Sequence, residues 1–91
     1  MAEHRREVLI VNKRGLHARA SAKFVATVAQ MEGTQVQVSK DGNSAAGGSI
    51  LGLMMLGAAK GDTVELAVGG AEAEARLAEL VALVENGFGE D

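Results

Sequence analysis

The residues best suited to chemistry in this 91-residue chain are His17 and Arg19, which lie two positions apart in the segment Gly15-Leu16-His17-Ala18-Arg19. His17 stands between a polar loop that contains Gly15 and the start of a predicted helix near Ala18. The first turn of a helix carries N–H groups without helical partners, and it attracts anions, phosphate in particular. A neutral imidazole there keeps one ring nitrogen free as a nucleophile, and the Arg19 guanidinium can hold a phosphate through two hydrogen bonds.

The spacing alone leaves two interpretations of His17 open. The first is a phosphoryl carrier, because phosphoryl transfer requires mainly positioning and charge neutralisation, which a shallow site can supply. The second is a histidine that caps or packs at a helix start without a chemical role. A metal site is not supported, since the chain has no Cys and the nearest acidic residue in the first helix is Glu32. A Ser/His/Asp triad with Ser21 is not supported either, since no acidic residue lies between Glu7 and Glu32.

A second informative segment follows Ser49 and is apolar nearly all round. It predicts a short helix over 50–56, with Ser49 as its N-cap. Because a small protein with helices on one face has little room to bury the whole segment, we predict an exposed apolar patch of Ile50, Leu51 and Met54 that docks partners. The alternative is a methionine-rich core filler. Ser49 also has a second interpretation, a phosphorylation switch whose added charge opposes docking at the patch.

The composition excludes several classes of protein. The chain has 9 Lys and Arg against 12 Asp and Glu, a net charge of −3, and no Cys, Pro, Trp or Tyr. The missing cysteines exclude a disulfide scaffold and a thiolate metal site, and mild acidity with few aromatic residues argues against nucleic-acid binding. No apolar run approaches the roughly 20 residues of a membrane helix, and the N-terminus does not resemble a signal peptide. We therefore expect a soluble, cytoplasmic protein with one domain over residues 1–91.

Hydrophobic periodicity predicts the elements that must position these residues. Alternating or β-branched runs predict four strands, over 7–11, 35–39, 44–46 and 63–68. Apolar residues at helical spacing predict three helices, over 18–30, 50–56 and 71–86. The order β-α-β-β-α-β-α with half-buried strands predicts a two-layer α+β sandwich with its helices on one face of the sheet. We expect His4 to be a solvated residue of the N-terminal tail and residues 89–91 to be frayed.

Three segments, Gly15–Ala20, Ser49–Gly57 and Ala59–Asp62, resemble the HPr family, the phosphocarrier proteins of the bacterial phosphoenolpyruvate-dependent phosphotransferase system. The resemblance runs from residue 7 to the end of the chain. It implies an open-faced β-sandwich with an antiparallel sheet of order 1-4-2-3 and three helices on one face. It also implies a phosphoryl carrier rather than an enzyme, with no cofactor and no metal of its own. We expect this carrier to be a monomer.

The same resemblance assigns roles to individual residues. His17 corresponds to the active-site histidine, phosphorylated on Nδ1 by phospho-enzyme I, and Arg19 corresponds to the active-site arginine. The phosphoryl group then passes to an enzyme IIA domain. Ser49 corresponds to the regulatory serine that a dedicated HPr kinase/phosphorylase modifies in many bacteria. The docking surface of the family surrounds the histidine and the second helix, and we expect four residues of this chain to belong to it: Ile50, Leu51, Met54 and Ala20.

Two positions depart from the common pattern of the family. Ala20 stands where many members have Pro, and Arg14 precedes Gly15 where many have Asn or Ser. The stretch 12–20 and the ending 87–91 look more like proteobacterial HPr and its nitrogen-branch paralogue. Both sugar uptake and a purely regulatory phosphorelay therefore stay open. The competing class of function is a small binding module that is never phosphorylated.

Overall fold

The computed structural model describes residues 3–90, and within them the elements follow the predicted order. The four strands are β1 (His4–Leu9), β2 (Thr34–Lys40), β3 (Asn43–Ala46) and β4 (Thr63–Gly70). The helices are α1 (Ala18–Ala29), α2 (Ile50–Met55) and α3 (Ala73–Glu85), and a 3₁₀ turn, η1 (Gly87–Gly89), follows α3. The strands form one antiparallel sheet in the order β1-β4-β2-β3, as the family resemblance implied.

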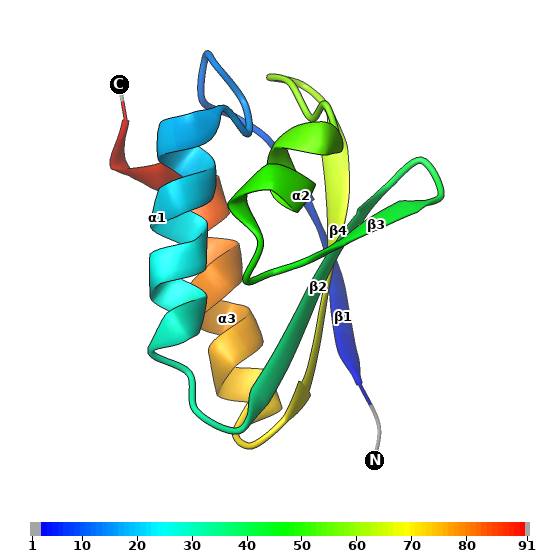
Figure 1. Cartoon of the computed structure of the whole chain (residues 1–91), viewed down its shortest axis with the longest axis vertical. Helices are drawn as coiled ribbons and strands as arrows, with labels where there is room; N and C mark the ends of the chain where they lie inside the picture. Colours follow the sequence, from blue (N-terminus) through cyan, green and yellow to red (C-terminus); the bar gives the residue numbers. More distant parts are fainter. Residues whose placement is uncertain (1–2, 91) are drawn as a thin grey trace.

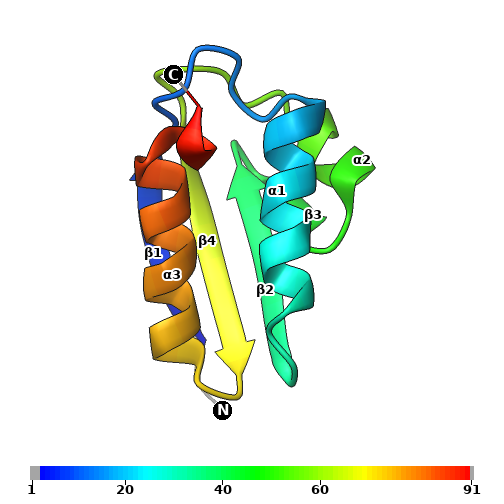
Figure 2. The same cartoon turned by 90° about the vertical axis from the view of Figure 1, so that its left-hand side faces the viewer.

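The helices cover one face of this sheet and leave the other face open (Figures 1 and 2). The apolar core lies between the two layers. In the central strand β4, Val64, Leu66 and Val68 point into it and are at most 2% exposed. Phe24 of α1 and Leu80 of α3 meet them from the helical layer and are equally buried. The alternation in the strands and the three- to four-residue spacing in the helices therefore predicted the correct inward faces.

The ends of several elements differ from the predicted ones. β1 starts at His4 rather than at residue 7. His4 pairs with Val68 and therefore belongs to the sheet rather than to a tail, although its side chain is exposed to solvent as expected. The physical reason is the length of β4, which offers ladder partners along the whole edge. β4 runs on to Gly70, and α3 accordingly begins at Ala73 instead of residue 71.

The C-terminal segment is folded rather than frayed over residues 87–90. Phe88 is only 1% exposed, and the backbone N–H of Glu90 donates to the carbonyl of Gly87 at 3.0 Å. Burial of one large aromatic side chain anchors the turn against the helical layer. Asp91, which we also expected to be frayed, lies outside the described residues. In residues 3–90, no helix combines the length and apolar character needed to cross a bilayer.

Candidate functional site

The loop between β1 and α1 is held in place by the segment that follows α2. Gly15 adopts a positive φ of 60°, and a Cβ at this position would collide with the backbone carbonyl of Ala58. The next residue, Leu16, is buried, and its N–H donates to that same carbonyl oxygen at 2.9 Å. Glycine is therefore required at this close approach. The result is a fixed starting point for α1 and for the side chain of His17.

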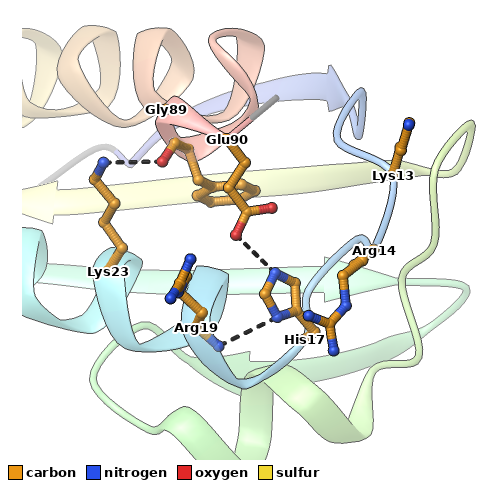
Figure 3. A pocket seen from close by; sticks show the side chains of 8 residues that line it. Lys13, Arg14, His17, Arg19, Lys23, Gly89 and Glu90 are labelled. Carbon is orange, nitrogen blue, oxygen red and sulfur yellow. Dashed lines mark hydrogen bonds and ion pairs between the residues drawn. The ribbon is translucent and has the colours of Figure 1, made fainter.

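His17 is the N-cap of α1, and its two ring nitrogens have different partners (Figure 3). Nδ1 accepts a hydrogen bond from the backbone N–H of Arg19 at 3.3 Å, which is the orientation toward the first turn that the sequence predicted. Nε2 lies 2.7 Å from Oε2 of Glu90. Because an ionised carboxylate only accepts hydrogen bonds, this pairing assigns the ring proton to Nε2 and leaves Nδ1 unprotonated, with its lone pair directed at the N–H of Arg19.

Glu90 is itself held by a second side chain. Its Oε1 accepts from Nδ2 of Asn12 at 3.0 Å, and the same Nδ2 donates to the carbonyl of Gly15 at 2.8 Å. Burial alone would raise the pKa of Glu90, but the hydrogen bonds from Asn12 and His17 and the charges of His17 and Arg19 outweigh it, so that its pKa lies below the usual value. A charged carboxylate is thus a fixed part of the site.

A shallow pocket of about 530 Å³ opens beside His17, whose side chain is 15% exposed. Residues of the β1–α1 loop, of α1 and of the C-terminal turn line it: Lys13, Arg14, His17, Arg19, Lys23, Phe88, Gly89 and Glu90. Arg14 and Arg19 lie on opposite sides of the imidazole (Figure 3). Four cationic side chains and one carboxylate therefore line this pocket, in a chain whose net charge is −3. This local excess of positive charge suits a phosphoryl dianion at the helix start.

The second candidate segment has the exposure that the sequence predicted. Ile50, Leu51 and Met54 are 41%, 68% and 40% exposed, so the interpretation of these residues as core filler is wrong. Met55, which was not predicted to belong to this patch, is the most exposed large apolar residue in the described part of the chain, at 77%. Ser49 caps α2, since its Oγ accepts from the N–H of Gly52 at 3.0 Å.

One residue assigned to the docking surface lies elsewhere. Ala20 is fully buried on the inward face of α1, together with Phe24. The expected contact between Ala20 and partners is therefore wrong. Its position next to Arg19 in the sequence is misleading, because consecutive residues of a helix point in directions about 100° apart.

Several residues of the site were not predicted from the sequence. Lys23 follows Arg19 by one helical turn, and this i,i+4 spacing would have placed both on the same side of α1. Asn12 and Glu90 carried no comparable signal, because Glu90 lies 73 positions from His17 and 78 positions from Asn12. Their assembly depends on how the C-terminal turn packs.

Comparisons with known proteins are consistent with this geometry. The sequence family described as "PTS HPr component phosphorylation site" matches residues 4–86. The phosphocarrier protein HPr of Neisseria meningitidis is 44% identical over 86 residues, which cover 94% of this chain and 96% of the relative. The phosphocarrier protein HPr of Pseudomonas aeruginosa is 45% identical over 85 residues, with 92% and 93% covered. Among solved structures, HPr-C-His from Thermoanaerobacter tengcongensis aligns with a TM-score of 0.88 at 40% identity, covering 100% of this chain and 99% of the other.

Proposed function

Because this chain belongs to the HPr family of phosphocarrier proteins of the phosphotransferase system, we propose that His17 is the residue that carries the phosphoryl group. The observation that carries this proposal is that the two ring nitrogens of His17 have different hydrogen-bond partners. Nε2 is bonded to the Glu90 carboxylate, while Nδ1 faces the first turn of α1 and the cationic pocket. The unprotonated ring nitrogen is thus the one placed at the anion-binding end of the helix.

The transfer step follows from this arrangement. The lone pair of Nδ1 attacks the phosphorus atom presented by phospho-enzyme I, and a new N–P bond forms. The bond between phosphorus and the donor atom breaks, and the donor keeps its electron pair. The first-turn N–H groups and the Arg19 guanidinium neutralise the charge of the phosphoryl oxygens. The reverse step delivers the group to an enzyme IIA domain, so the chain ends each cycle unchanged and works only with partner enzymes.

The exposed patch of Ile50, Leu51 and Met54 is the proposed docking surface. α2, which bears the patch, packs against α1, whose first turn carries His17. Donor and acceptor must approach the same ring nitrogen, so they must use one surface in succession. A shared surface favours weak binding and rapid release over tight association. Flexible methionine side chains suit contact with differently shaped partners.

Ser49 is the proposed site of regulation. Its hydroxyl is the cap of α2 and lies directly before two exposed patch residues, Ile50 and Leu51. A phosphate added by an HPr kinase/phosphorylase would bring about two negative charges to the rim of an apolar docking surface. Docking would then require desolvation of that charge. Phosphorylation of Ser49 is therefore expected to weaken the approach of enzyme I.

The proposed setting is a monomer in the cytoplasm that serves sugar uptake. Both curated relatives described above carry the HPr name, which supports this branch over a purely regulatory phosphorelay. The acceptor separates the two branches. A carrier for uptake passes its phosphoryl group to the enzyme IIA domain of a sugar transporter, whereas a regulatory carrier passes it only to a nitrogen-branch IIA protein.

Mass spectrometry after incubation with enzyme I, Mg²⁺ and phosphoenolpyruvate tests the carrier function. We expect the intact chain to gain one phosphoryl group, which is lost in acid as a phosphoramidate should be. His17→Ala should gain none. His4→Ala is the matched control, because it removes the only other histidine of the chain, in β1, and should be phosphorylated like the unaltered protein. Phosphorylation of His17→Ala, or none of the unaltered chain, would contradict the proposal.

A further inference from the structure

We infer that Glu90 is a positioning residue for phosphoryl transfer, whose carboxylate holds the proton on Nε2 of His17 and thereby directs the phosphoryl group to Nδ1. The inference rests on the proposed function and deepens it. Glu90 lies beyond residues 4–86, the part of the chain that the family description matches. Glu90 stands at the end of the C-terminal turn that follows α3.

The contact itself has the geometry of a charge-assisted hydrogen bond. Oε2 of Glu90 lies 2.7 Å from Nε2 of His17, and the two side chains are only 19% and 15% exposed. A neutral imidazole has one N–H, and its position depends on which nitrogen finds an acceptor. Nδ1 already accepts from the Arg19 N–H, so the two contacts favour the same tautomer. The arrangement is analogous to the carboxylate that orients the histidine of a catalytic triad.

The carboxylate is held by the fold and is not a chance contact of a loose end. Phe88 anchors the turn in the core, and Nζ of Lys23 donates to its carbonyl oxygen at 2.9 Å. Nδ2 of Asn12, a residue that is 3% exposed, fixes the other carboxylate oxygen at 3.0 Å. Glu90 is thus restrained both through its backbone and through its second oxygen.

The carboxylate also has a role during the reaction. When Nδ1 of a neutral ring bonds to phosphorus, the proton stays on Nε2 and the ring acquires a positive charge. The phosphoryl group bonds to Nδ1, and the Glu90 carboxylate faces the positively charged ring at the other nitrogen, Nε2. The ion pair formed in this way is stronger than the resting-state hydrogen bond, in which the carboxylate is charged but the ring is neutral. The contact therefore stabilises the product side of the attack more than the starting state.

Three variants test the inference: Glu90→Ala, Glu90→Gln and the control Glu85→Ala. The Gln side chain lacks the charge and keeps only one acceptor oxygen, which can face either Nε2 of His17 or Nδ2 of Asn12. Glu85 is exposed at the end of α3, so its removal controls for the loss of one negative charge near the C-terminus. Nitrogen-15 NMR of the His17 ring at about pH 8, above the ordinary range of histidine titration, reports the tautomer without any partner. The initial rate of phosphorylation by phospho-enzyme I is then measured for the same samples.

We expect Glu90→Ala to show a larger share of the Nδ1–H tautomer and a phosphorylation rate lower by about tenfold. Glu90→Gln should fall between Glu90→Ala and the unaltered chain in both tautomer and rate, and Glu85→Ala should match the unaltered chain. An unchanged tautomer and rate in Glu90→Ala would overturn the inference. So would a lower rate with an unchanged tautomer, which would assign Glu90 to partner docking. If instead the unaltered chain is not phosphorylated at all, the proposed function fails, whatever the tautomer.

Discussion

The chemistry of this protein depends on one imidazole whose two nitrogens are distinguished by their neighbours. Nδ1 faces the N–H of Arg19, and Nε2 faces the carboxylate of Glu90. Capping of the helix and carriage of a phosphoryl group, which the sequence presented as alternatives, are compatible at this residue. The Nδ1 lone pair that caps α1 in the resting state is the one that attacks phosphorus. The phosphoryl oxygens then become the acceptors for the first-turn N–H groups.

Arg19 gives the prediction at the level of a single residue. Its guanidinium lines the pocket beside His17, and a planar fork can bind two phosphoryl oxygens at once. We expect Arg19→Ala to lower the rate of phosphorylation by enzyme I by about 10- to 100-fold, and Arg19→Lys to lose less because the charge remains. Arg6→Ala, an exposed change in β1, is the control. Rates of Arg19→Ala equal to those of the control would exclude a role in transfer.

Among the elements, the two helix starts were the most predictable features. Ser49 and His17 both cap the helices that follow them, because capping depends on residues within one turn of each other. Strand and helix ends that depend on distant partners were less predictable. The start of β1 at His4 and the end of β4 at Gly70 follow from pairing between strands, which local periodicity does not report.

Ser49 gives the prediction at the level of an element. Ser49→Asp and Ser49→Asn both keep a side-chain oxygen that can cap α2, but only the first adds a negative charge beside Ile50 and Leu51. We therefore expect Ser49→Asp to raise the KM of enzyme I for this chain by about tenfold, since charge at a docking surface acts mainly on the encounter. Ser49→Asn should behave like the unaltered chain. Equal KM values for the two variants would show that added charge at this cap does not control docking.

For the whole molecule, the sequence predicted the architecture better than it predicted the site. The two-layer arrangement follows from periodicity, whereas the sheet order came from the family resemblance. His17 and Arg19 were predictable because a helix start brings them together. Glu90 was not, because its contact needs the sheet, α3 and the burial of Phe88 to be in place first. Ala20 shows the converse error, in which a position near the motif was assigned to the surface although the helix turns it into the core.

The same long-range contact predicts how stability depends on pH. The pKa of Glu90 lies below its ordinary value of 4.5 in the folded state, so in acid the unfolded chain binds more protons at this group than the folded chain does. The stabilisation that it contributes is fully present above pH 4.5 and is lost as the pH falls through the lowered pKa. Urea unfolding of the unaltered chain and of Glu90→Gln measures this contribution, because the effects of all other carboxylates cancel in the difference. We expect the difference in unfolding free energy between the two chains to be constant near neutrality. In acid the unaltered chain should lose stability relative to Glu90→Gln. A difference that stays constant down to pH values well below 4.5 would contradict the ionised contact to His17 and Asn12.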